Sequence, residues 1–101
     1  MYYYQIIGFG SCIWCQRANQ LASQEQLPYV ASWIENSPDL LEWHKTNYGM
    51  KTVPIVLKMH TEGHGFELIG GYTDFMFWLT SLTTAKSVHS ALICLMTSTL
   101  N

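Results

Sequence analysis

Residues 2–15 read YYYQIIGFGSCIWC, and this stretch decides the fold because it joins a strand pattern to a helix start at two cysteines. The aromatic and β-branched residues from Tyr2 to Phe9 are typical of a β-strand, and the glycines at its end break that pattern. From Ile13 onward, apolar residues recur at helical spacing. We therefore predict a strand, a short loop and a helix, with Cys12 and Cys15 at the helix start.

The remainder of the chain continues the alternation of strands and helices. We predict the later elements as a strand at residues 29–34, a helix at 38–48, a strand at 52–59, a strand at 66–69 and a helix from about residue 73. A strand–helix–strand unit joins parallel strands, and the last two strands are close enough to pair as an antiparallel hairpin. The predicted fold class is α/β, with a mixed four-stranded sheet flanked by three helices. Val88, Leu92 and Leu95 would line one face of an extra C-terminal helix.

Length and composition bound the class of protein. The 101 residues suit one domain, which we place at residues 1–84, with an extension at 85–101 that packs on it as a helix. The formal net charge is −2 without a basic stripe, so the chain lacks the surface that nucleic-acid binding needs. No run reaches the ~18 apolar residues of a membrane span, and Met1–Gln5 lacks the basic start of a signal peptide. We expect a monomeric cytoplasmic protein with no nucleic-acid or membrane partner.

The motif Cys12-Ile13-Trp14-Cys15 places a cysteine at the start of the predicted helix. Helix N-termini carry unpaired N–H groups and a partial positive charge, and both stabilise a thiolate over a thiol. Since the thiolate is the attacking species, Cys12 is the candidate nucleophile. Cys15 lies about one helical turn further and can attack a mixed disulfide formed at Cys12, which makes it the candidate resolving cysteine.

A metal site is the alternative interpretation of this cysteine pair. Zinc needs four ligands, and His60 and His64 in a predicted turn would be the candidates to complete a site. A lone pair of this kind in a reducing compartment favours redox chemistry, and we expect no metal cofactor. The third cysteine, Cys94, is interpreted as a small buried apolar residue, with a regulatory or intermolecular thiol as the alternative.

Two further motifs accompany the cysteines. Thr52-Val53-Pro54 precedes an apolar run, and Gly-Gly-Tyr-Thr-Asp-Phe at residues 70–75 follows a predicted strand. With all three motifs in this order and spacing, the chain resembles the glutaredoxin family over about residues 2–82, closest to the small dithiol glutaredoxins of bacteria. The resemblance implies a thioredoxin-like fold. It also implies a glutathione-dependent thiol–disulfide oxidoreductase that reduces protein disulfides and glutathione mixed disulfides through Cys12 and Cys15.

A glutathione site is the second implication of the resemblance. It assigns glutathione contacts to Trp14, Lys51, Thr52, Val53, Pro54, Gly71, Tyr72, Thr73 and Asp74. In the family the motif proline is cis, and the backbone of the residue before it, here Val53, binds the cysteinyl part of glutathione. Thr73 and the helix N–H groups would bind the γ-glutamyl carboxylate, and Asp74 would bind its ammonium group. Lys51, or less directly Lys45, would pair with the glycine carboxylate.

These residues also have ordinary structural interpretations. Pro54 begins an apolar run, where a trans peptide bond is far more common than a cis one. Thr73 and Asp74 lie where helix-capping residues are favoured. Trp14 would suit a protein core, but the loop around a nucleophile must be open, so we expect partial exposure. Lys51 would suit a solvated surface.

The sequence departs from the family pattern at two places. Proline commonly follows the nucleophile, where this chain has Ile13, and lysine or arginine often precedes the motif, where this chain has Gly10-Ser11. Some relatives with altered motifs hold an iron–sulfur cluster with glutathione, so a cluster-binding or carrier protein is the alternative function. A thioredoxin-like reductant is disfavoured, because residues 70–74 suit a glutathione site that thioredoxins lack. The expected partners are glutathione as reductant and disulfide-containing proteins such as a ribonucleotide reductase.

Overall fold

Strands and helices alternate along the part of the chain that the computed structural model describes, residues 1–63 and 65–81. The elements are the strands β1 (Tyr2–Gly8), β2 (Tyr29–Trp33), β3 (Ile55–His60) and β4 (Phe66–Gly70), the helices α1 (Ile13–Gln24) and α2 (Pro38–Tyr48), and a third helix at residues 72–81. The elements predicted before residue 82 are all present. β3 begins at Ile55 and not at residue 52, because residues 51–53 form a bend ahead of Pro54.

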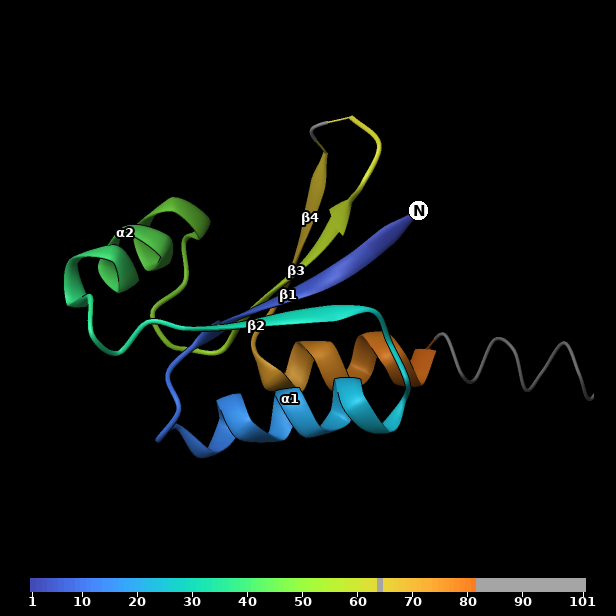
Figure 1. The fold of residues 1–101 in the computed structure, drawn as a ribbon, viewed down its shortest axis with the longest axis horizontal. Helices are drawn as coiled ribbons and strands as arrows, with labels where there is room; N and C mark the ends of the chain where they lie inside the picture. The colour runs from blue at the N-terminus through green and yellow to red at the C-terminus, as the bar shows by residue number, and fades with distance from the viewer. Residues whose placement is uncertain (64, 82–101) are drawn as a thin grey trace, which may run out of the picture.

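The four strands form a mixed sheet in the order β2-β1-β3-β4 (Figure 1). β1 and β2 are parallel, as a strand–helix–strand unit requires, and Ile6 lies opposite Ala31. β3 is antiparallel to both of its neighbours, with Val56 opposite Ile6 in β1 and Leu57 opposite Leu68 in β4. This is the predicted α/β class, a thioredoxin-like sheet with β1 and β3 at its centre.

α1 and the third helix lie side by side against one face of the sheet (Figure 1). The buried residues of this core are Tyr4, Ile6, Ala18, Ala22, Val56, Phe75 and Leu79. The ring of Phe75 lies 5.4 Å from that of Tyr4, and the indole N–H of Trp78 donates to the Tyr4 hydroxyl at 3.1 Å. Packing against the same strands therefore holds the two helices in fixed positions relative to each other.

The opposite face of the sheet has a smaller core next to α2. Its buried residues are Ile7, Ile55 and Leu57. Tyr48 from the last turn of α2 and Met50 just beyond it pack against them. α2 ends at Gly49, whose φ of +65° is a left-handed conformation that glycine adopts without strain. The chain then turns into β3, and this turn brings residues 50–54 beside the end of β1.

The predicted extension at residues 85–101, with its helix and Cys94, lies outside the described residues, and so does His64. The proposed domain boundary at residue 84 falls there too. Within residues 1–63 and 65–81, none of the helices is both long enough and apolar enough to span a membrane.

Candidate functional site

Cys12 is the N-cap residue of α1, the position predicted for it. Its backbone is extended (φ −80°, ψ 118°), and its carbonyl accepts the first helical hydrogen bond, from the Gln16 N–H at 3.0 Å. The Cys12 Sγ accepts a hydrogen bond from the backbone N–H of Cys15 at 3.3 Å. A backbone donor and a helix dipole both interact more strongly with an anionic sulfur than with a neutral one. Cys12 is half-buried, and its sulfur lies at the start of α1 beside a backbone donor.

Cys15 lies one turn further along α1 and has 0% of its surface exposed. Its side chain packs against Gly8 at the end of β1. Burial, together with the hydrogen bond to Cys12, raises the pKa of Cys15 to about 12. The Cys15 side chain is therefore a neutral thiol at neutral pH. The two cysteines are unequal, because Cys12 is half-buried whereas Cys15 is fully buried and closed to an external disulfide.

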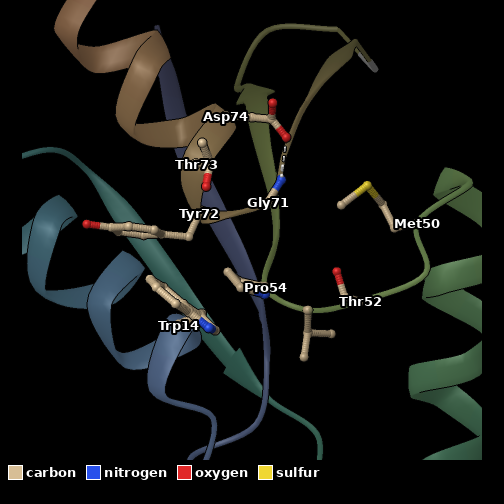
Figure 2. A pocket seen from close by; sticks show the side chains of 9 residues that line it. Trp14, Met50, Thr52, Pro54, Gly71, Tyr72, Thr73 and Asp74 are labelled. Carbon is tan, nitrogen blue, oxygen red and sulfur yellow. Dashed lines mark hydrogen bonds between the residues drawn. The ribbon is translucent and has the colours of Figure 1, made fainter.

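A cavity of about 430 Å³ opens beside the first turn of α1 (Figure 2). The residues that line it are Trp14, Met50, Thr52, Val53, Pro54, Gly71, Tyr72, Thr73 and Asp74. They come from the cysteine motif, the turn between α2 and β3, and the start of the third helix. This volume is typical of small-molecule sites. The cavity brings together every predicted glutathione contact except Lys51.

The segment before β3 forms one side of the cavity. The peptide bond between Val53 and Pro54 is cis, as the resemblance predicts, and Pro54 is buried. A Cβ built on Gly71 would lie 3.7 Å from the Pro54 carbonyl oxygen, so this segment touches the start of the third helix. No hydrogen bond within the described residues uses the backbone of Val53. Val53 lines the cavity, and its N–H and C=O are not used by another described residue.

The start of the third helix is built around two glycines and a carboxylate. Gly70 has a φ of +126°, and a Cβ there would come within 2.8 Å of the Asp74 Cγ, so a larger residue does not fit. The Gly71 N–H donates to the Asp74 Oδ2 at 3.1 Å (Figure 2). Asp74 therefore caps the helix, as its structural interpretation predicts. Its side chain is exposed, so the second carboxylate oxygen is open to a ligand cation.

Trp14 and Tyr72 form an aromatic wall of the cavity. Their ring centroids are 5.4 Å apart, with an angle of 37° between the planes. The Arg17 guanidinium lies 4.7 Å from the centroid of the Trp14 ring, at cation–π distance. Trp14 is 48% exposed, which confirms the expected partial exposure and excludes a core role. Through Trp14 the cysteine motif contributes to the cavity, although Cys12 is not itself a lining residue.

Four residues either differ from the sequence interpretation in their placement or were not singled out by it. Met50 lines the cavity and was not predicted, although its place directly after Gly49 pointed to the turn that leads to β3. Lys51 is exposed and does not line the cavity. Lys45 on α2 pairs with Glu42 at 3.3 Å. Arg17, which was not singled out, is the basic side chain in contact with the aromatic wall.

The histidine proposed for a metal site lies far from the cysteines. In the antiparallel pairing of β3 with β1, His60 lies opposite Tyr2, which is at the other end of β1 from Gly8. The His60 Nε2 is 3.4 Å from the Glu67 Oε1. Across residues 1–63 and 65–81, no group of three or more His, Cys, Asp or Glu side chains is arranged to hold a metal ion.

Comparisons of the chain with protein-family models, with curated proteins and with solved structures find no match.

The raised pKa of Cys15 predicts that the reduced protein loses stability at alkaline pH. In the unfolded chain this thiol ionises near ~8.5. In the folded chain its pKa is raised to about 12, so above pH ~8.5 the folded state binds more protons than the unfolded state. The stabilisation from the neutral Cys15 thiol is complete below pH ~8.5 and is lost as the pH rises towards the folded pKa.

Cys15→Ala should remove this pH dependence. The free energy of unfolding of the parent, measured in urea with a non-thiol reductant, should fall relative to that of the variant by on the order of 1–2 kcal/mol between about pH 8 and pH 10. Parallel profiles for the two proteins over this range would contradict the burial of a neutral thiol at position 15.

Proposed function

We propose that this chain is a glutathione-dependent thiol–disulfide oxidoreductase of the glutaredoxin type. The observation that carries the proposal is an accessible cysteine sulfur at a helix N-terminus, next to a cavity whose polar groups suit a γ-glutamyl peptide. The sulfur alone would suit many thiol reactions. The cavity favours a reaction with glutathione over other thiol reactions, because it offers separate groups for a peptide backbone, a carboxylate and an ammonium ion.

The backbone of Val53 supplies the first of these groups. Val53 lines the cavity and its N–H and C=O bind no other described residue, so we propose that they pair with the cysteinyl residue of glutathione as an added strand would. Such pairing fixes the direction of the peptide. The glutathione sulfur is then brought towards the first turn of α1, where Trp14 forms the adjoining wall.

The start of the third helix supplies the groups for the γ-glutamyl end. Its unpaired N–H groups and the Thr73 hydroxyl suit a carboxylate. The open oxygen of Asp74 suits the ammonium group while Oδ2 keeps its bond to Gly71. Capping and ligand binding by Asp74 are therefore compatible. For the glycine carboxylate, the exposed Lys51 remains the proposed partner, because it adjoins Thr52 at the cavity rim.

The proposed reaction is a series of thiol–disulfide exchanges. The Cys12 thiolate attacks one sulfur of a substrate disulfide, and the other sulfur leaves as a thiolate that takes up a proton. When Cys12 then holds glutathione, a second glutathione attacks the glutathione sulfur, releasing glutathione disulfide and the Cys12 thiolate. When Cys12 holds a protein, Cys15 attacks the Cys12 sulfur, releases the reduced protein and closes the Cys12–Cys15 disulfide. Two glutathione molecules reduce that disulfide again.

A reducing compartment such as the cytoplasm suits this cycle, because glutathione is kept reduced there. The protein substrates would be disulfide-containing proteins, of which a ribonucleotide reductase is one proposed example. The test of the function is a coupled assay with glutathione, glutathione reductase and a small glutathione mixed disulfide. Turnover that needs both the chain and glutathione supports the proposal, and its absence contradicts it.

Substitutions of the two cysteines should have different effects on turnover in this assay and in a second assay with a protein disulfide. Cys12→Ser should abolish turnover of both substrates, since Cys15 is buried and cannot replace the nucleophile. Cys15→Ser should keep turnover of the glutathione mixed disulfide and lose dithiol reduction of the protein. A Cys15→Ser variant that is inactive on both substrates, while still folded, would show that the division of roles is wrong.

Asp74→Asn should weaken recognition of the γ-glutamyl group without unfolding the helix start. The amide oxygen can still accept the Gly71 N–H, but the charge opposite the ammonium group is lost. A charge-assisted hydrogen bond contributes about 1 kcal/mol more than a neutral one, or roughly fivefold in affinity. We expect a KM for glutathione mixed disulfides raised by this factor. A disulfide without the γ-glutamyl group should be nearly unaffected.

Asp39→Asn is the matched control, because Asp39 lies in the first turn of α2 and is not among the cavity residues. It should leave both KM values unchanged. If Asp74→Asn instead slows both substrates equally and lowers the melting temperature, Asp74 acts through capping alone.

A further inference from the structure

Gly8, the last residue of β1, has no backbone reason to be glycine. It pairs with Trp33 in β2, and its carbonyl accepts the Ile34 N–H at 2.8 Å. Among the described glycines, a positive φ occurs at Gly49, Gly63 and Gly70, but not at Gly8. Any L-residue could adopt this strand conformation. Glycine is therefore required at position 8 by the limited space around its Cα and not by its backbone conformation.

The sulfur of Cys15 occupies that space. A Cβ at position 8 would overlap the Cys15 Sγ, and it would lie 3.1 Å from the Cys15 Cβ and 3.5 Å from Cζ3 of Trp33. Gly8 and Cys15 are both buried. The Cys15 thiol therefore occupies the space that a side chain at position 8 would fill.

We propose that Gly8 is a positioning residue that gives the resolving sulfur a closed slot, so that Cys12 is the one partner among the described cysteines with which Cys15 can exchange. This inference rests on the proposed function. In the slot, Cys15 is shielded from external thiols and disulfides. It stays one turn from Cys12, whose sulfur already faces the Cys15 N–H at 3.3 Å.

The slot acts on one step of the cycle. When Cys12 carries a substrate thiol, the Cys15 sulfur attacks the Cys12 sulfur and gives up its proton. A bond forms between Cys12 and Cys15, the bond from Cys12 to the substrate breaks, and the substrate thiolate takes up the proton. A Cys15 outside the slot would instead be open to glutathione disulfide, and a second mixed disulfide would compete with closure.

Gly8→Ala should move the sulfur out of the slot, because the added methyl group overlaps it. The readout is alkylation of the reduced native protein by iodoacetamide, followed by peptide mapping that resolves each cysteine. In the parent, Cys12 should react and Cys15 should be protected. In Gly8→Ala, the rate at Cys15 should rise at least about tenfold, as a buried thiol becomes accessible. A Cys15 rate within about twofold of the parent would overturn the proposal.

Gly65→Ala is the matched control for the glycine-to-alanine change. A Cβ there would meet the His60 ring at an ordinary contact distance of 3.6 Å, and the site is remote from both cysteines. It should leave the alkylation of Cys15 at the parental rate. A similar rise in Gly65→Ala would show that loss of glycine, and not the slot, exposes the thiol.

A second measurement separates the slot from a general packing defect. Overpacking a core typically costs enough to lower Tm by about 5–15 °C in a domain of this size. If the sulfur is the clashing group, at least half of the Tm loss caused by Gly8→Ala should disappear in a Cys15→Ala background. An equal loss in both backgrounds would place the clash elsewhere and overturn the proposal.

The products formed with glutathione disulfide give the functional readout. The parent should end as the Cys12–Cys15 disulfide, whereas Gly8→Ala should accumulate glutathione on Cys12 and on Cys15. A Gly8→Ala protein that closes its disulfide as fast as the parent would contradict the positioning role. A parent protein that forms no mixed disulfide with glutathione would contradict the proposed function. The alkylation experiment uses no glutathione, so its result would still decide the role of Gly8.

Discussion

The first turn of α1 packs on the end of β1, and the positions of both sulfurs depend on this contact. The Cys15 sulfur fills the space next to the Cα of Gly8, and the Cys15 N–H in turn faces the Cys12 sulfur. β1 is a central strand, so its end is held from both sides, by Trp33 of β2 and by Ile55 of β3. The packing of α1 on the sheet thus determines where the half-buried Cys12 and the fully buried Cys15 thiol lie.

The cavity beside the first turn of α1 follows from the register of the same sheet. Ile7 lies opposite Ile55, so the chain just before β3, with its cis proline, must adjoin the end of β1. Val56 lies opposite Gly70, so the hairpin brings the two glycines back to the same edge. Groups from three distant segments therefore meet within a few ångströms of one another without a long loop. At this edge Gly71 lies beside Pro54, where a Cβ built on Gly71 would be 3.7 Å from the Pro54 carbonyl oxygen.

Local signals allowed much of this to be predicted from the sequence, whereas contacts between segments were not predictable. The N-cap position of Cys12 was predictable because strand-ending glycines and helical spacing are properties of neighbouring residues. The cis bond before Pro54 was not, since composition favours trans, and only the resemblance of the motifs indicated it.

The contacts of two other residues, Met50 and Gly8, depend on tertiary geometry. Met50 enters the cavity because α2 ends in a left-handed turn. Arg17 meets Trp14 within α1 at i, i+3 spacing, which is a local contact that helical periodicity indicates. Gly8 reads in the sequence as the glycine that ends a strand. Its contact with the Cys15 sulfur shows a packing role that no local pattern indicates. Asp74 caps the third helix, and the proposed ligand role of its second carboxylate oxygen is compatible with this, but the sequence pattern alone does not separate the two.

The proposed function requires that the cavity binds glutathione while Cys12 holds its sulfur. The direct measurement is a comparison of backbone amide chemical shifts in the Cys15→Ser protein, free and as its isolated mixed disulfide with glutathione. We expect large changes at Cys12, which carries the glutathione, and also at Val53, Gly71 and Thr73, which line the cavity in separate segments. Changes confined to residues 11–16, with the signals of the other two segments unmoved, would contradict it.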